Sequence, residues 1–325
     1  MPDAEADFAF LVHPLRRWQR PLLGVRLLHL PLFLGRDAGI DGVGAVARVD
    51  VETAAGWCRG LVVSVPDTAE RLAAEQGRAL AHQERAAQVA MGVGVRAIGL
   101  GNALAVVAGR GKALAERTAT PVTTGNASTA WACATITKQV LADRGAPRGP
   151  VGLLGFRGTV GEAVAATLAA DGVEVFVDVA GRAARTAEQL GCVPVSLDDL
   201  LRRPSVFVGA STTGPVIPAA RLPTGAILVD LALPPTLEPG PRPSGLRVVA
   251  GERLRLPGAV RRDVWGAIWL ALARYGRGCV FACFAEPIAI ALGGVVPSGR
   301  HLSVDDVAAA GAQLSRLGFR PVVTD

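Results

Sequence analysis

Lysine is nearly absent from this sequence. Lys112 and Lys138 are the only two among 34 basic residues, so the net charge of +6 comes almost entirely from arginine. Aromatic residues are also scarce, at 5% of the chain, and no tract interleaves them with arginines as nucleic-acid-binding surfaces do. We therefore expect no nucleic-acid partner, whereas a basic surface would suit an acidic partner such as a carrier protein.

Long apolar runs are absent too. A helix that spans a bilayer needs roughly 18 to 20 apolar residues, and the best segments here, near residues 22–34 and 280–296, are broken by Arg, His, Pro, Gly or Glu. Acidic residues at positions 3, 5 and 7 precede the first apolar residues, which is the opposite of a secretory signal. The sequence thus predicts a protein that is not transmembrane.

Several catalytic and metal-binding patterns are missing. The five cysteines form no CxxC pair and their number is odd, so we expect neither a disulfide framework nor a structural zinc site, and we expect a reducing, cytoplasmic location. No His, Asp and Glu residues are spaced as metal ligands, so no metal is expected. The absence of G-x-S-x-G argues against a serine hydrolase.

What is present is enough apolar material for about two domains, since half of the 325 residues are hydrophobic. Gly145–Pro150 has the composition of a linker. After it, strand candidates alternate with helical stretches, which predicts βαβ units and a mostly parallel sheet. These candidates are Val151–Gly155, Val173–Val179, Ser205–Ala210, Ala226–Leu231 and Leu246–Val249.

From residue 262 the pattern is helical, with predicted helices from Asp263 through Ala273, from Cys279 to about Leu292, and from Ser303 to Leu317. We expect these helices to pack back on the N-terminal region. The predicted fold is therefore α/β, with a Rossmann-like parallel-sheet domain (148–261) inserted in a second α/β domain. That substrate domain comprises residues 1–147 and is completed by the C-terminal helices (262–325).

A glycine-punctuated turn follows the first strand after the linker. Gly155, Gly158 and Gly161 are spaced G-x-x-G-x-x-G rather than the strict G-x-G-x-x-G of dinucleotide-binding loops. The first glycine allows a sharp turn, the second lets the backbone approach a pyrophosphate, and the third permits close packing of helix on strand. A strand precedes the loop, a helix follows it and a second strand ends near Asp178, so the context favours a nucleotide site over a purely structural turn.

The choice of cofactor depends on the end of that second strand. Asp178 stands near the position where an acid holds the ribose hydroxyls of NAD, but Arg182 and Arg185 follow directly and suit the 2′-phosphate of NADP. NADPH is favoured and NADH is left open, since both arginines would also suit a solvated helix start.

One thiol lies in the apolar run Val280–Glu286. A cysteine among Phe, Ala and Val is usually a small buried hydrophobe, but Glu286 is costly to bury without purpose, and Pro287 should bend the helix near Cys283. A thiolate can take an acyl group from a thioester, and a nicotinamide can then reduce that group to an aldehyde. Cys279 is a rival, because we expect it nearer the helix N-terminus, where the dipole lowers the pKa of a thiol.

Six segments together carry a family resemblance. They are Phe8–Pro14, Thr123–Asn126, Gly155–Gly161, Leu228–Asp230, Phe281–Glu286 and Gly318–Pro321. In this order, and over nearly the whole chain, they resemble the cyanobacterial-type long-chain acyl-[acyl-carrier-protein] reductases, which form fatty aldehydes. The Cys283 segment and the last segment are the more specific signals.

The resemblance implies NADPH-dependent reduction of an acyl thioester, on acyl-carrier protein or coenzyme A, to an aldehyde through a cysteinyl acyl-enzyme on Cys283. It also implies that the glycine loop holds the pyrophosphate, that Arg182 reaches the 2′-phosphate, and that the nicotinamide lies at the end of a sheet strand. The residues so assigned are Gly155, Arg157, Gly158, Thr159, Val160, Gly161, Arg182, Ala210, Ser211 and Thr212 for the cofactor, and Thr124, Asn126 and Glu286 for the substrate pocket.

Some residues depart from that family's pattern. Leu104 and Ala105 stand where a small hydroxyl pair is expected, and Asn102 replaces a small residue, so the acyl group need not be a long fatty chain. Two alternatives stay open. One is a shikimate-dehydrogenase-like oxidoreductase that acts on a small carbonyl or alcohol without covalent catalysis, and the other is a cofactor-binding regulator with an inactive site.

Overall fold

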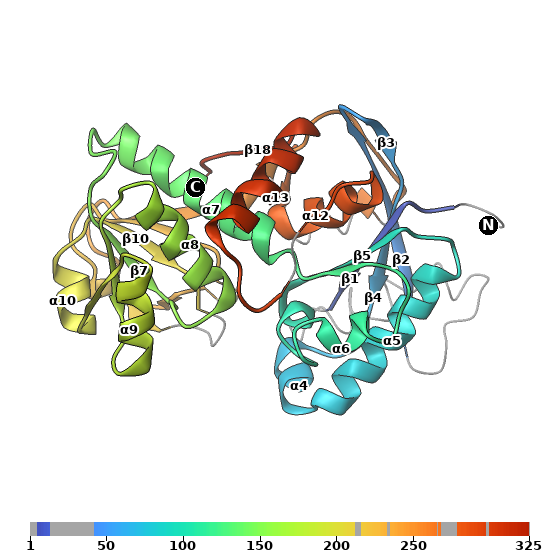
Figure 1. Cartoon of the computed structure of the whole chain (residues 1–325), viewed down its shortest axis with the longest axis horizontal. Helices are drawn as coiled ribbons and strands as arrows, with labels where there is room; N and C mark the ends of the chain where they lie inside the picture. Colours follow the sequence, from blue (N-terminus) through green and yellow to red (C-terminus); the bar gives the residue numbers. More distant parts are fainter. Residues whose placement is uncertain are drawn as a thin grey trace. The chain divides into compact units, whose positions relative to one another are not determined.

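The computed structural model describes residues 5–13, 42–211, 216–232, 235–264, 266–267, 278–296 and 299–324. The chain forms two compact units, each assembled from segments that are far apart in the sequence. The first unit comprises Met1–Gly125, Arg255–Gly299 and Ala312–Arg320, and the second comprises Asn126–Leu254, Arg300–Gly311 and Pro321–Asp325. Both units combine strands with helices, which confirms the predicted α/β class (Figure 1).

The first unit is built on a seven-stranded sheet. Its strands are β1 (Phe8–Val12), β2 (Gly44–Thr53), β3 (Gly56–Cys58), β4 (Gly60–Ser64), β5 (Ala97–Leu100), β6 (Val122–Thr123) and β16 (Val260–Arg262). The order is β16-β2-β4-β1-β5-β6, with β3 paired to β2. β4, β1, β5 and β6 run parallel, whereas β2 is antiparallel to its partners β3, β4 and β16.

Helices cover both faces of this sheet. They are α4 (Ala69–Ala74), α5 (Gln76–Met91), the 3-10 helix η1 (Asn102–Ala105), α6 (Lys112–Ala115) and α12 (Ala282–Ala291), the last preceded by the short strand β17 (Cys279–Phe281). Ala9 and Leu11 of β1 join the core under α5. Phe8 and Phe10 alternate to the other face, where their rings lie 5.4 and 5.3 Å from that of Phe284 in α12, edge to face.

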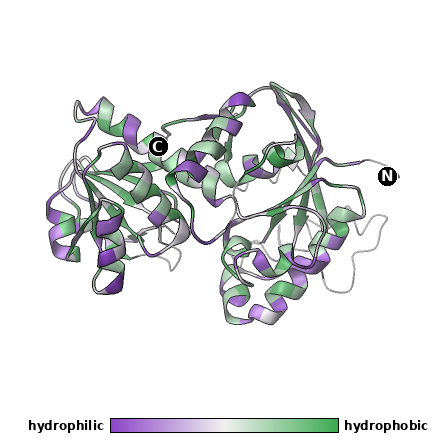
Figure 2. Ribbon diagram, viewed as in Figure 1, coloured by the Kyte–Doolittle hydropathy of each residue, from purple (hydrophilic) through white to green (hydrophobic). Residues whose placement is uncertain are grey.

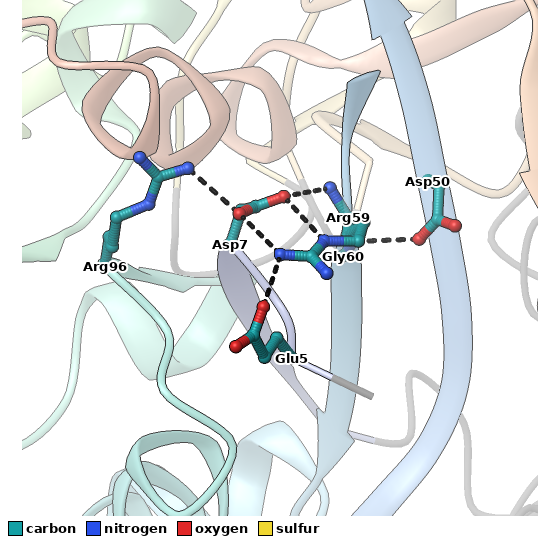
Figure 3. A network of polar contacts seen from close by, with 6 residues as sticks. All are labelled: Glu5, Asp7, Asp50, Arg59, Gly60 and Arg96. Atoms are coloured by element: carbon teal, nitrogen blue, oxygen red, sulfur yellow. Dashed lines mark hydrogen bonds and ion pairs between the residues drawn. The ribbon is translucent and has the colours of Figure 1, made fainter. Parts of the chain in front are cut away.

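A charged network closes the amino ends of the parallel strands in the first unit (Figure 3). The Asp7 carboxylate accepts hydrogen bonds from the Arg59 backbone N–H (2.7 Å), from Arg59 Nε (3.2 Å) and from Arg96 Nη2 (2.9 Å). Burial alone would raise the pKa of Asp7, but the bonds from the two arginines hold it below its usual range. The network joins the segments that lead into β1, β4 and β5.

The second unit is built on a six-stranded parallel sheet. Its strands are β7 (Val151–Leu154), β8 (Val175–Asp178), β9 (Val193–Val195), β10 (Val206–Gly209), β12 (Ile227–Asp230) and β14 (Arg247–Ala250), in the order β14-β12-β10-β7-β8-β9. The chain builds outward from β7 to β9, then crosses back to β10 and builds outward again. This is a Rossmann-like sheet whose strand order reverses between β7 and β10.

The helices of the second unit are α7 (Asn126–Asp143), α8 (Thr159–Ala170), α9 (Arg182–Gln189), α10 (Leu197–Arg202) and the 3-10 helix η2 (Ala219–Arg221), and a strand pair β11 (Ile217–Pro218) and β13 (Leu237–Glu238) adjoins them. Leu153 and Val208 point into the core beneath α7 and α8. Leu154 and Phe207 point into the core with α10 on the other face. Both faces are therefore apolar, as in covered parallel sheets, and the strands are coloured accordingly in Figure 2.

Three elements have residues in both units: β15 (Arg253–Arg255), α13 (Val304–Arg316) and β18 (Arg320–Pro321). The start of α13 carries the predicted capping box. Asp306 N–H donates to Ser303 Oγ (3.1 Å), and Ser303 N–H donates to Asp306 Oδ2 (2.9 Å). None of the helices in the described part of the chain is both long and apolar enough to span a bilayer.

The division of the chain differs from the predicted domains 1–147, 148–261 and 262–325. The second unit begins at Asn126, because Ala130, Cys133 and Ala134 of α7 pack into the core beneath α8. Residues 300–311 and 321–325 also join the second unit rather than the first. The predicted helix from Asp263 through Ala273 lies mostly outside the described residues.

Candidate functional site

The glycine loop of the second unit forms a close cradle. Gly155 has a φ of +95°, and a Cβ there would lie 2.6 Å from the carbonyl carbon of Ala210 and 2.8 Å from Ser211 N. A Cβ on Gly161 would collide with the carbonyl oxygen of Gly155, whereas at Gly158 the nearest atom would be 3.4 Å away. Gly155 and Gly161 are thus needed for packing, and Gly158 leaves its backbone open to a ligand.

Helix α8 begins at this cradle. Its N-cap is Gly158, and no side chain caps the first turn. The first N–H groups of a helix have no intrahelical acceptor, and the helix dipole favours negative charge there. The loop and the start of α8 therefore fit the pyrophosphate of a dinucleotide.

The loop lies at the point where the strand order reverses. Ala210 and Ser211 follow β10 directly beside Gly155, and both are buried, at 4% and 7% exposure. Ligands of open α/β sheets bind at this position, outside the carboxyl ends of the strands. The structure thus brings together Gly155, Ala210 and Ser211, which the sequence assigned to one cofactor, while Thr212 lies outside the described residues.

A cavity of about 720 Å³ adjoins the end of β8. Arg157, Asp178 and Arg182 line it and are exposed. Neither guanidinium group forms an ion pair with a described residue. The two guanidinium groups suit a phosphate monoester, and the Asp178 carboxylate at the same cavity suits ribose hydroxyls. The other lining residues are Val179, Ala180, Ala183, Pro194, Val195 and Ser196.

Two carboxyl groups at the same sheet edge were not assigned to the site from the sequence. Asp230, at the end of β12, accepts hydrogen bonds from Thr236 Oγ1 (2.7 Å), Thr236 N (3.0 Å) and Ala232 N (3.1 Å). Glu252 follows β14, and its Oε2 is buried with no hydrogen-bond partner among the described residues. Burial, reinforced by the Asp230 charge and opposed by Arg253, raises the pKa of Glu252 to about 8. An orphaned oxygen at this edge is consistent with a polar ligand there.

The five cysteines differ in access. Cys58, Cys133 and Cys192 are buried, whereas Cys279 and Cys283 are partly exposed. Burial raises the pKa of Cys58 to about 12 and that of Cys192 to about 11, and it also raises the pKa of Cys133. The buried three therefore remain protonated at neutral pH, which leaves Cys279 and Cys283 as the reactive candidates.

The prediction of a helix from Cys279 to Leu292 is wrong at its start. Residues Cys279–Phe281 form β17, and α12 begins at Ala282, with Phe281 as N-cap and no side-chain cap. Cys283, rather than Cys279, therefore occupies the first turn, where the positive end of the helix dipole stabilises a thiolate. The extended φ and ψ of Phe281, −74° and 146°, mark the change from strand to helix.

Two glycines allow α12 to lie close to the carboxyl ends of β5 and β6. A Cβ on Gly99 would be 2.6 Å from Cγ of Pro287. A Cβ on Gly125 would collide with Cβ of Cys283 and lie 2.5 Å from its Cα, and Gly125 has a φ of +73°. The backbone of Gly125 thus packs against Cα and Cβ of Cys283.

The residues assigned to the substrate pocket lie in α12 and in the segment that follows β6. Glu286 has 0% exposure, and its Oε1 accepts a hydrogen bond from the hydroxyl of Thr123, a residue outside the predicted pocket. Thr124 is buried, and a Cβ on Gly111 would lie 3.1 Å from its methyl group, on the α6 side of the sheet. Asn126 is the first residue of α7, in the second unit.

The departures at residues 102–105 lie in the turn η1. Leu104 and Ala105 are buried in the core under α5, and Gln83 Nε2 donates to the Leu104 carbonyl at 2.8 Å. Asn102 has a φ of +47°, and the next N–H, that of Ala103, donates to His13 Nε2 at 3.2 Å. Leu104 is therefore a core residue, which explains its apolar character without reference to a substrate.

Among the described residues, no three His, Cys, Asp or Glu side chains are grouped so that they could hold a metal ion.

No family model matches the chain. A curated relative, the aminotransferase PigE of a Serratia species, is 27% identical over 285 residues, which is 81% of this chain and 32% of the relative. The chain thus spans about a third of the length of the curated relative that it matches.

Solved structures with a similar arrangement include L-tryptophan dehydrogenase from Nostoc punctiforme, at 13% identity and a TM-score of 0.35 over 96% of this chain and 81% of that one. Another is D-lactate dehydrogenase from Lactobacillus jensenii, at 14% identity and a TM-score of 0.25 over 69% of this chain and 71% of that one.

Proposed function

We propose that the protein is a nicotinamide-dependent oxidoreductase that reduces an acyl thioester to an aldehyde through an acyl-enzyme on Cys283. The observation that carries the proposal is the partly exposed thiol in the first turn of α12, in a chain whose three buried cysteines are shielded. The glycine cradle at the start of α8 adds the site for a dinucleotide.

The thiol can perform the transfer step. The Cys283 thiolate attacks the thioester carbonyl, a new C–S bond forms, and the thiol of the carrier protein or coenzyme A leaves with a proton. Cys283 lies in the first turn of α12, where the positive end of the helix dipole favours the negative charge of the oxyanion. When bound, NADPH supplies the hydride that brings the acyl group to the aldehyde level. Release of the aldehyde then returns the free thiol of Cys283.

Removal of the thiol tests the covalent step. We expect Cys283→Ala and Cys283→Ser to abolish aldehyde formation while cofactor binding is unchanged, because the glycine loop lies in a different segment. Incubation of the wild-type protein with acyl thioesters, without NADPH, should add the acyl mass to the peptide that contains Cys283. Cys279→Ala is the matched control and should retain the adduct. Turnover by Cys283→Ala would exclude the mechanism.

The cavity at Arg157 and Arg182 supports NADPH over NADH. Replacing both with alanine should weaken NADPH binding about 10- to 100-fold, the equivalent of one charge-assisted hydrogen bond, and leave NADH binding nearly unchanged. Arg185→Ala is the control, because Arg185 lies on the same helix but does not line the cavity. Equal losses for the two cofactors, measured by fluorescence titration, would contradict the assignment.

The curated relative is named an aminotransferase, but this chain offers no suitable lysine. Pyridoxal-phosphate chemistry uses a lysine Schiff base, and the side chains of Lys112 and Lys138 are 81% and 41% exposed and paired with Glu116 and Asp171. An aldehyde is, however, an acceptor for amino transfer. The proposed product therefore fits a chain that matches about a third of such a relative.

The alternative is direct reduction of a small carbonyl without covalent catalysis. The same nucleotide cradle would serve this reaction, and the thiol of Cys283 would not be needed. Turnover of a free ketone or aldehyde by the Cys283→Ala variant, with no acyl adduct on the wild-type protein, would establish this alternative instead.

A further inference from the structure

A chain of hydrogen bonds links α12 to the segment that covers Cys283. The Thr123 hydroxyl donates to Oε1 of Glu286, and the Gly125 N–H donates to the same hydroxyl oxygen at 3.1 Å. Thr123 and Glu286 both have 0% exposure. A hydroxyl group has one proton. Because the Thr123 hydroxyl donates that proton to Glu286, its lone pairs are directed so that they accept from the Gly125 N–H.

Gly125 lies at the end of this chain and against the thiol-bearing residue. A Cβ on Gly125 would lie 2.5 Å from Cα of Cys283, so the backbone of Gly125 already packs directly against Cys283 and a shift toward α12 would bring the two residues into collision. The hydrogen bond to Thr123 prevents the opposite movement. The backbone of Gly125 is thus held from both sides, and it limits the rotamers open to the side chain beneath it.

We propose that Glu286 is a positioning residue, which acts through Thr123 to hold Gly125 against Cys283 and so sets the direction of the sulfur. A carboxyl group is costly to bury, and an apolar residue would fill the same space, so a directional role accounts for Glu286 at this position. The inference rests on the proposed function only in naming Cys283 as the nucleophile.

Labelling of single cysteines by N-ethylmaleimide, followed by mass spectrometry, tests the proposal. Thr123→Val has nearly the same shape but lacks the hydroxyl, so Gly125 should move away and uncover the thiol. We expect Cys283 to be labelled about 2- to 10-fold faster, the range that corresponds to one hydrogen bond. In the same variant, kcat for thioester reduction should fall with KM little changed, because the attack direction is lost rather than the binding site.

Thr123→Ser is the matched control, since it restores the hydroxyl and should return both rates to wild-type values. Cys58, Cys133 and Cys192 are internal controls, because they are buried and stay unlabelled in a folded protein. A wild-type labelling rate in Thr123→Val, or no restoration by Thr123→Ser, would overturn the proposal.

If Thr123→Val unfolds and exposes the buried cysteines, a second pair of variants tests whether Glu286 positions Cys283. Glu286→Gln keeps an acceptor and should label at the wild-type rate, whereas Glu286→Met removes it and should label faster. Equal rates for these two would overturn the proposal. Labelling needs neither thioester nor cofactor, so failure of the proposed function, seen as no acyl adduct on the wild-type protein, remains a separate result.

Discussion

Gly125 meets two demands at once. Its φ of +73° lies in the left-handed region, and the space in front of its Cα is filled by Cys283. Either demand alone favours glycine, and together they exclude every residue with a Cβ. The absence of a Cβ on Gly125 therefore allows α12 to lie close to the chain that follows β6.

Gly125→Ala should lower the free energy of unfolding by more than the strain of a left-handed alanine, which is about 1 kcal/mol. The added methyl group must push Cys283 aside, so the total loss should reach about 2–4 kcal/mol. Gly145→Ala is the matched control, because Gly145 has a φ of +70° and no atom within 4 Å of its hypothetical Cβ. Urea denaturation of both variants measures the difference, and equal losses would contradict the collision.

For single residues, the sequence indicates which residue types could carry chemistry better than it indicates which residues they contact in the fold. Cys283, the glycine loop and Arg182 can be proposed as site residues from the sequence, because each stands in a short segment with a characteristic pattern. Thr123, Gly99 and Glu252 are not, because their roles depend on which strand or helix lies opposite. Glu286 attracts notice as an acid in an apolar run, but its bond to Thr123 joins residues 163 positions apart.

The contact between β7 and α8 is the clearest case at the scale of the element. Helix α8 begins directly after Gly158, and Gly161 lies in its first turn against the carbonyl of Gly155. The helix can therefore start close to the strand that precedes it, which aims its N-terminus at the switch point of the sheet.

Gly161→Ala should weaken cofactor binding at least about 10-fold, because the helix must move outward to make room for the methyl group. Alanine inside a helix would otherwise stabilise it by about 1 kcal/mol relative to glycine. A lowered melting temperature together with weaker NADPH binding is therefore the expected result. A raised melting temperature with unchanged binding would show that the loop tolerates the side chain.

The βαβ rhythm of residues 151–250 was predictable, because parallel strands are continuous apolar runs bounded by glycine and proline. The start of α12 was not. The run Cys279–Ala285 is apolar throughout, and such a run does not separate strand from helix by periodicity. Pairing with a neighbouring strand makes residues 279–281 extended, and this shifts the helix N-terminus from Cys279 to the residue before Cys283.

At the scale of the whole molecule, the network around Asp7 links stability to pH. The folded pKa of Asp7 lies below its usual value, so its contribution is present above the unfolded pKa of about 3.9 and is lost as the pH falls through the folded value. Arg59 and Arg96 are 44% and 58% exposed, so solvent screening reduces the effect.

Asp7→Asn should lower the free energy of unfolding by about 1–2 kcal/mol at pH 7, and the difference from wild type should shrink below about pH 4. Asp143→Asn is the control, since Asp143 is exposed at the end of α7 and should change stability by less than about 0.5 kcal/mol at any pH. Chemical denaturation between pH 3 and 7 gives both curves. A constant difference over this range would show that the Asp7 charge is not responsible.

The segments of the first unit are translated at different times, because the second unit lies between them in the sequence. Phe8 and Phe10 leave the ribosome early. The ring that covers them, that of Phe284, follows only after the six-stranded sheet of the second unit has been translated. Until then the growing chain displays bare aromatic surface, which is the kind of surface that chaperones bind. The same helix carries Cys283, so a polypeptide released before residue 282 would expose this aromatic surface and would lack the nucleophile of the proposed reaction.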